Sequence, residues 1–264
     1  MRVAAAFVLT LGLLAAACSS SPTQPTSPQP PPTPPVTPPP TPPPDPNPPA
    51  GPSTPPPPPR LAKIRFVAFG DSLTEGVVSA PVTFTLTTVP YAYPARLNDA
   101  LHARYTAQPE IVVFNEGKAG EFALDGKVRL PDAIKADTPD VVLLMEGANE
   151  INVLGRKGIS RAVGALEDMI KDSQRRGVIV FVATLPPQRA GGVRAEGAAY
   201  VDELNAQIRK TALDEGATLV DVNAQLDLSF VGADGLHLTE AGYVRLGAIF
   251  ADAIRQSFET PPPS

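Results

Sequence analysis

The chain has 264 residues, of which 34 are proline and one is cysteine, and its formal net charge at pH 7 is −5. It contains no basic stripe and no cluster of arginine with aromatic residues, which argues against nucleic acid as a partner. One cysteine excludes a disulfide framework, and two histidines without a cysteine cluster argue against a metal site, so we expect no cofactor and no metal.

The first 18 residues are typical of a secretory signal peptide. Arg2 supplies a positive charge, residues 3–17 are almost wholly apolar or small, and Cys18 follows three alanines. An apolar run of this length is typical of a signal and too short for a membrane span. Its end resembles the lipobox of bacterial lipoproteins, which implies lipidation of Cys18; the alternative is an ordinary signal cleaved nearby. We therefore expect an exported cell-envelope protein, held to a bacterial membrane by this lipid anchor only.

The next segment, residues 19–60, is mostly proline with serine and threonine and carries little charge. Such a composition lacks the apolar content for a core and favours extended polyproline II conformations, which predicts a disordered linker. Residues 61–258 are then consistent with one folded domain, expected to be a monomer, and residues 259–264 with a disordered tail.

Within the domain, short apolar runs alternate with longer segments of helical pattern. Runs that are continuously apolar are typical of parallel strands covered on both faces. The alternation predicts an α/β fold with an open, doubly wound parallel sheet and helices on both of its faces. The expected strands are residues 64–69, 111–114, 141–145, 178–183 and 218–220, and the expected helices are residues 93–104, 123–135, 160–176, 197–215 and a last one from Thr239 to about residue 258.

Five residues that can carry chemistry follow four of these strands. Ser72 lies three residues beyond the first strand, Gly120 and Asn149 follow the second and third, and Asp234 and His237 lie beyond the fifth. Because the carboxyl ends of parallel strands meet at one edge of a sheet, we expect all five residues to lie close together. A serine hydroxyl, an imidazole and a carboxylate are the groups that nucleophilic catalysis by serine requires.

Each of these residues also has a structural interpretation when it is considered alone. Gly-Asp-Ser is common in turns, and a serine before a helix is more often a cap, as Asn149 can also be. The pair Asp234-x-x-His237 can be a surface ion pair or two metal ligands. Their joint occurrence at one sheet edge favours the catalytic interpretation. We interpret His102, the other histidine, as structural.

Four short blocks of the domain resemble the SGNH (or GDSL) hydrolase family. The resemblance implies a three-layer α/β/α sandwich of flavodoxin-like type with a five-stranded parallel sheet. The last block, Asp234-x-x-His237, follows the family's spacing, whereas Glu150 in the third stands where the family usually has aspartate. The first three blocks read Gly70-Asp71-Ser72-Leu73-Thr74-Glu75-Gly76, Asn115-Glu116-Gly117-Lys118-Ala119-Gly120 and Gly147-Ala148-Asn149-Glu150.

The resemblance implies a serine esterase with a role for each of these residues. Ser72 is the nucleophile, His237 takes its proton and Asp234 orients the imidazole. The backbone N–H groups of Ser72 and Gly120 and the side-chain amide of Asn149 form the oxyanion hole. Gly117 competes with Gly120 for this role, and Gly120 is preferred because it lies five residues after Asn115, as in the family.

The substrate is expected to be a small-molecule, lipid or glycan carboxylic ester. Residues 77–90, apolar with threonines, form either a lid and acyl-contacting wall or a surface hairpin, and residues 184–197 leave the same sheet edge as a candidate opposite wall. The absence of tryptophan favours a pocket for a short acyl chain over an aromatic platform for sugars. Two alternatives stay open, an acyltransferase with the same site and an inactive envelope-binding module.

Overall fold

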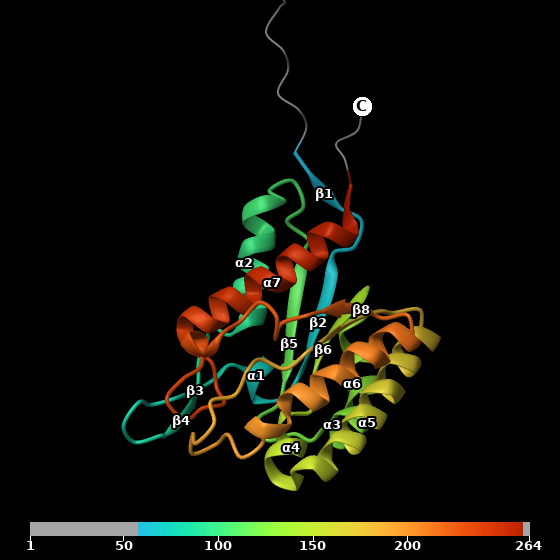
Figure 1. Cartoon of the computed structure of the whole chain (residues 1–264). Helices are drawn as coiled ribbons and strands as arrows, with labels where there is room; N and C mark the ends of the chain where they lie inside the picture. The colour runs from blue at the N-terminus through green and yellow to red at the C-terminus, as the bar shows by residue number, and fades with distance from the viewer. Residues whose placement is uncertain (1–57, 261–264) are drawn as a thin grey trace, which may run out of the picture. The chain divides into compact units, whose positions relative to one another are not determined.

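A computed structural model of the protein describes residues 58–260 (Figure 1). The expected signal peptide with Cys18, the expected linker up to residue 57 and residues 261–264 lie outside the described part. None of the helices described between residues 58 and 260 is long and apolar enough to cross a membrane.

The centre of the fold is a five-stranded sheet in the order β5-β2-β6-β7-β8, and every neighbouring pair in it is parallel. Numbered along the chain, this is the 2-1-3-4-5 order of flavodoxin-like folds. The expected α/β fold with a parallel sheet is confirmed. The strands are β2 (Arg65–Gly70), β5 (Val112–Gly117), β6 (Val141–Met145), β7 (Ile179–Ala183) and β8 (Thr218–Val220).

Helices cover both faces of the sheet. On one face, α2 (Tyr93–Arg104) packs against α7 (Glu240–Phe258), and the rings of Tyr93 and Phe250 stack at 4.9 Å between them. On the other face, α5 (Arg156–Arg175) lies between α3 (Ala123–Asp137) and α6 (Val201–Asp214), as Figure 1 shows. All five residues of β6, the central strand, are fully buried, which explains why that segment is continuously apolar.

Two short antiparallel pairs lie outside the main sheet. Strand β3 (Val77–Ser79) pairs with β4 (Leu86–Thr88) in a hairpin that projects from the domain. Strand β1 (Arg60–Leu61) pairs with β9 (Glu259–Thr260). Arg60 and the two residues Glu259 and Thr260, which lie just outside the expected bounds of 61–258, thus take part in a small antiparallel ribbon.

Several helix and strand bounds differ from those expected. Strand β5 continues through three residues, Asn115 to Gly117, because it stays in register with β2 up to the pair Gly70 and Gly117. The helix expected over 160–176 begins earlier, as α5 at Arg156. It is preceded by α4 (Ala148–Leu154), which was not expected, and Gly155 separates the two helices in a left-handed conformation with φ +57°. The helix expected over 197–215 begins with a 3₁₀ turn at Ala198–Tyr200 before α6.

Candidate active site

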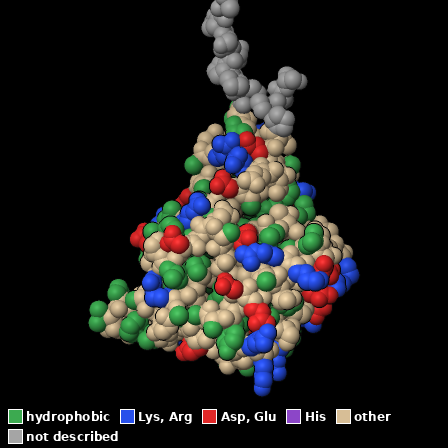
Figure 2. Space-filling model, viewed as in Figure 1, with side chains coloured by type: hydrophobic (Ala, Val, Ile, Leu, Met, Phe, Trp, Pro, Cys, Tyr) green, Lys and Arg blue, Asp and Glu red, His purple; other side chains and the backbone are tan. Residues whose placement is uncertain are grey.

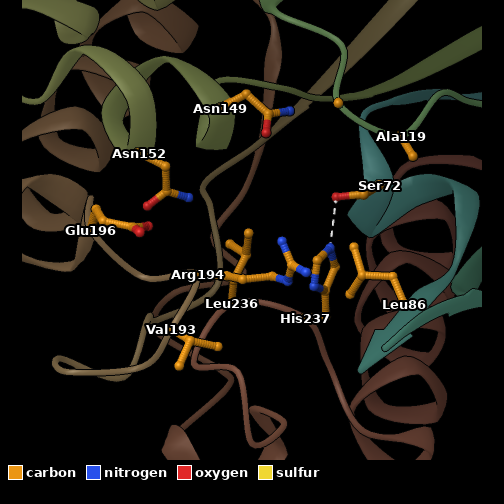
Figure 3. A pocket seen from close by; sticks show the side chains of 11 residues that line it. Ser72, Leu86, Ala119, Asn149, Asn152, Val193, Arg194, Glu196, Leu236 and His237 are labelled. Atoms are coloured by element: carbon orange, nitrogen blue, oxygen red, sulfur yellow. Dashed lines mark hydrogen bonds between the residues drawn. The ribbon is translucent and has the colours of Figure 1, made fainter. Parts of the chain in front are cut away.

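Ser72 opens the short helix α1 (Ser72–Glu75) directly after β2. The N-cap of this helix is Asp71, whose Oδ1 accepts the backbone N–H of Leu73 at 2.9 Å. The interpretation of Ser72 as a helix cap is therefore wrong, because the preceding aspartate satisfies the helix terminus. The serine hydroxyl is left free to face the pocket (Figure 3), although the residue as a whole is buried.

Asp234, His237 and Ser72 form a continuous hydrogen-bonded chain. The ring Nδ1 of His237 lies 2.6 Å from Asp234 Oδ2, and its Nε2 lies 3.0 Å from Ser72 Oγ (Figure 3). The other carboxylate oxygen of Asp234 accepts the backbone N–H groups of Leu236 and His237, both at 3.0 Å. Gly235 allows this tight turn, since its φ of +87° lies in the left-handed region that favours glycine. Ser72 and His237 thus meet at this edge of the sheet although they are 165 positions apart in the sequence.

The environment of Asp234 keeps its carboxylate ionised. Burial alone would raise the pKa of Asp234, but the hydrogen bond from the His237 ring, followed by those from the backbone N–H groups of Leu236 and His237, outweighs it, so the pKa is lowered. An ionised Asp234 holds the proton of the imidazole on Nδ1 and leaves Nε2 as an acceptor toward Ser72. That arrangement can activate the hydroxyl as a nucleophile.

The loop after β5 brings Gly120 into the same pocket. Gly120 adopts φ +77°, and open space surrounds the position that a Cβ would take. Within residues 58–260 its backbone N–H, like that of Ser72 at the start of α1, has no hydrogen-bond partner. Gly117 instead belongs to β5, where a Cβ would lie 2.0 Å from the backbone nitrogen of Glu75. Close packing against Glu75 explains why residue 117 is a glycine, whereas Gly120 is the glycine that lines the pocket.

Asn149 reaches the pocket from the first turn of α4, after β6. Its Nδ2 donates to the carbonyl of Glu121 at 2.7 Å, which orients the amide and leaves its second N–H available. The neighbouring Glu150, where the sequence departs from the family pattern, is buried, and its Oε1 accepts the N–H of Ala123 at the start of α3. Its role is thus to cap a helix N-terminus. Figure 3 shows Asn149 across the pocket from His237.

Two segments supply the walls of this pocket, which has a volume of about 250 Å³. Residues 77–90 form the β3–β4 hairpin, and Leu86 from it lines the pocket beside His237 (Figure 3). The hairpin tip is apolar and exposed, with Val82 85% accessible, and Figure 2 shows hydrophobic side chains where it projects. The loop after β7 contributes Val193, Arg194 and Glu196 on the opposite side. Residues 77–90 are thus a hairpin that also contributes one wall residue.

Four buried carboxyl side chains, those of Glu146, Asp71, Glu121 and Glu150, lie near one another, and Glu146 and Glu121 have no role in the sequence-based prediction. Glu146, at the end of β6, is fully buried, and within residues 58–260 neither of its oxygens has a hydrogen-bond partner. Burial raises the pKa of Glu146 well above its usual value, and the charges of Asp71, Glu121 and Glu150 act in the same direction, against Arg129. Burial likewise raises the pKa of Asp71 to about 7. Burial therefore favours the protonated form of the Glu146 carboxyl in the folded protein.

Replacement Glu146→Gln should flatten the dependence of stability on pH. Because the folded pKa of Glu146 lies above the unfolded one, the unfolded chain loses the proton first, and stability falls as pH rises from about 4.5 toward the folded pKa. Within that window, this carboxyl lowers the free energy of unfolding by up to about 1.4 kcal/mol per pH unit. Urea denaturation at several pH values measures the slope, with Glu110→Gln, an exposed glutamate, as the matched control. If the free energy of unfolding changed equally with pH in the wild type and in Glu146→Gln, the pKa of Glu146 would not be raised by folding.

All five residues predicted to form the site line the pocket or hydrogen-bond to a residue that does. His102 lies apart on α2, where its Nε2 is 2.9 Å from the carbonyl of Ile111. In the part of the chain described, no three His, Cys, Asp or Glu side chains are grouped to hold a metal ion. Asn152 also lines the pocket and was not predicted; it lies three residues after Asn149 on the same face of α4, and this spacing was visible in the sequence.

The region of the chain that contains this site is similar to known proteins. Residues 68–245 match the model of the GDSL-like lipase/acylhydrolase family. Among curated proteins, a multidomain esterase of Ruminococcus flavefaciens is 27% identical over 126 residues, which are 47% of this chain and 16% of that protein. The chain therefore corresponds to a small part of that relative.

Solved structures of low sequence identity share the fold. The lipase/acylhydrolase of Enterococcus faecalis is 24% identical with a TM-score of 0.63, over 76% of this chain and 100% of that one. The aryl esterase of M. smegmatis is 20% identical with a TM-score of 0.65, over 73% and 99% of the two chains. The carbohydrate acetylesterase Est24 of Sinorhizobium meliloti is 21% identical with a TM-score of 0.63, over 74% and 99%.

Proposed function

Because the chain belongs to the GDSL-like lipase/acylhydrolase family, we propose that it is a serine esterase that hydrolyses carboxylic esters through an acyl-enzyme on Ser72. The observation that carries this proposal is the hydrogen-bonded chain from Asp234 through His237 to Ser72 Oγ, which ends inside a pocket. A hydroxyl so placed has a base within reach, and the base has a carboxylate that orients it.

During acylation, one proton moves in two steps, first from Ser72 to His237 and then from His237 to the leaving alcohol. Ser72 Oγ attacks the ester carbonyl carbon while its proton passes to Nε2 of His237. The tetrahedral intermediate then collapses, the bond to the alcohol oxygen breaks, and the leaving alcohol takes the proton from Nε2. Asp234 stabilises the imidazolium that exists between these two transfers.

Deacylation repeats the sequence with water. His237 accepts a proton from a water molecule that attacks the acyl carbon, and the bond between this carbon and Ser72 Oγ breaks. The proton then returns to Oγ, and the acid leaves. In both halves the oxyanion is stabilised by the N–H groups of Ser72 and Gly120 and by the amide of Asn149, three donors in one pocket.

The test is hydrolysis of p-nitrophenyl acetate, butyrate and octanoate by the full chain, with a fluorophosphonate probe that labels activated serines. Since the pocket has a volume of only about 250 Å³, the two short esters should turn over faster than the octanoate. The probe should abolish turnover, and peptide mapping should find it on Ser72. Labelling at another residue, or turnover that survives stoichiometric labelling, would refute the proposal.

The same assay separates hydrolysis from acyl transfer. With an added alcohol such as glycerol, a hydrolase still releases free acetate in amounts equal to p-nitrophenol, whereas an acyltransferase forms the glycerol ester. An inactive binding module would give neither product.

Replacement Asn149→Ala should lower kcat by about 10²–10³-fold and leave KM little changed, because it removes an oxyanion donor that acts mainly in the transition state. The measurement is steady-state kinetics on p-nitrophenyl acetate, with thermal melting to confirm folding. Asn98→Ala is the matched control, since this asparagine lies on α2 and accepts the N–H of Val113; its kcat should stay within about twofold of wild type. A raised KM at unchanged kcat for Asn149→Ala would place this side chain in ground-state binding instead.

A further inference from the structure

One side of the pocket carries three polar side chains that the proposed chemistry does not use. Asn152 comes from α4, and Arg194 and Glu196 come from the loop after β7. We call these three residues the polar wall. Figure 3 shows Asn152 and Glu196 on the side of the pocket away from Ser72 and Ala119, and Arg194 reaching from that side toward His237. The role inferred below for the polar wall rests on the proposed esterase function.

Asn152 is held in one orientation by the loop it faces. Its Oδ1 accepts the backbone N–H of Gly197 at 2.6 Å, so the oxygen is committed to the protein. The Nδ2 atom is buried and has no hydrogen-bond partner within residues 58–260. Figure 3 shows this nitrogen directed toward the pocket interior. A buried donor without a partner destabilises the empty site, and a bound acceptor removes that cost.

Arg194 places a second donor beside the imidazole. Its backbone N–H donates to the carbonyl of Asp234 at 3.0 Å, which anchors the loop to the catalytic turn. Its Nε is buried and has no hydrogen-bond partner in the described part of the chain; it lies 3.9 Å from Asp234 Oδ2, which is an ion-pair distance but beyond hydrogen-bond distance. The guanidinium lies beside His237 in the pocket (Figure 3). Its terminal N–H groups, unlike the buried Nε, can be reached by a substrate oxygen from the pocket.

Glu196 adds an exposed carboxylate acceptor at the same wall. The wall thus offers two donors and one acceptor, whereas Leu86, Val193 and Leu236 make other parts of the pocket apolar. A carboxylate or phosphate on the substrate would meet the negative charge of Glu196. An alkyl group would leave Asn152 and Arg194 desolvated and unpaired. Hydroxyl groups both donate and accept, and they match the wall.

We infer that the polar wall selects esters whose alcohol is a polyhydroxylated ring, such as an acetylated sugar, and that Asn152 and Arg194 are specificity-determining residues. Recognition here uses hydrogen bonds, since no Phe, Tyr or Trp is among the described residues that line the pocket. A sugar can therefore bind without the aromatic platform that the sequence lacks.

The experiment compares two primary acetates built on a six-membered ring, methyl 6-O-acetylglucopyranoside, whose ring carries hydroxyl and ether oxygens, and cyclohexylmethyl acetate, whose ring carries none. The full chain should favour the sugar ester by about tenfold or more in kcat/KM. Asn152→Asp keeps the acceptor for Gly197, removes the donor and adds a negative charge, and Arg194→Met removes the guanidinium and keeps the apolar stem. Each should lower kcat/KM for the sugar ester by about tenfold or more while that for the cyclohexyl ester changes by less than about threefold. The control is Arg156→Met on the exposed surface.

The outcomes are distinct. A selective loss on the sugar ester in both variants, with no change in Arg156→Met, supports the inference. Equal losses on both esters would overturn it, because the wall would then act only on the imidazole or on folding. A wild-type preference for the cyclohexyl ester would also overturn it, while leaving the esterase proposal intact. Failure to hydrolyse either ester and p-nitrophenyl acetate would refute both proposals together.

Discussion

Replacement Ser72→Ala should reduce kcat by about 10⁴–10⁶-fold at nearly unchanged stability, because it removes the atom that forms the acyl-enzyme. The expectation rests on the 3.0 Å contact between Ser72 Oγ and His237 Nε2 inside the pocket. His237→Ala should cost about as much, and the double variant should be no worse than either, since nucleophile and base act as a unit. The residual rate over water reflects the oxyanion donors.

Steady-state and single-turnover kinetics on p-nitrophenyl acetate measure this effect. Ser160→Ala is the matched control, because Ser160 is an exposed residue of α5 that does not line the pocket. If Ser72→Ala retained more than about a tenth of the wild-type kcat, another group would be the nucleophile. If the single losses of Ser72→Ala and His237→Ala multiplied in the double variant, the two residues would not act in the same step.

Replacement Asp234→Asn should lower kcat by about 10⁴-fold, although it is nearly isosteric. Oδ1 can still accept the N–H groups of Leu236 and His237, so the turn is kept. The new amide, however, places a donor against His237 Nδ1, where the carboxylate now accepts at 2.6 Å. The imidazole then carries its proton on Nε2 and donates to Ser72, so it can no longer take the serine proton.

Kinetics and a denaturation curve of the same protein distinguish a wrong tautomer from a damaged fold. Asp252→Asn, an exposed aspartate of α7, provides the matched control. Asp234→Asn should unfold at a denaturant concentration close to that of the wild type while its turnover collapses. A loss of kcat smaller than about tenfold would mean that Asp234 does not set the tautomer of His237.

Much of the fold followed from the pattern of apolar residues. Strands β6 and β8 and helix α2 have the expected bounds, because a run such as Val141–Met145 has no stable place other than the centre of a covered sheet. The bounds failed where the signal is local and weak. The short helix α4 was not predicted, and the polar residues Asn115 and Glu116 stay in a strand because β2 pairs with them.

The candidate site was predictable for the same reason. Parallel strands oblige the residues that follow them to share one edge, so Ser72 and His237 were expected to meet despite their distance in sequence. The spacing of residues in the sequence did not decide whether Gly117 or Gly120 faces the pocket. The close contact of Gly117 with the backbone of Glu75 decided it in favour of Gly120.

By itself, the sequence determined the fold class, the sheet edge and the five residues gathered there, because periodicity and chain direction act through the backbone. Only the tertiary structure decided that Asp71 caps α1, that Glu146 is buried without a partner, and that Asn152 and Arg194 present free donors to the pocket. The physical reason is that burial and hydrogen-bond satisfaction depend on side chains supplied by distant segments. The Arg194 loop is one such segment, since it is held in place by the turn that carries Asp234.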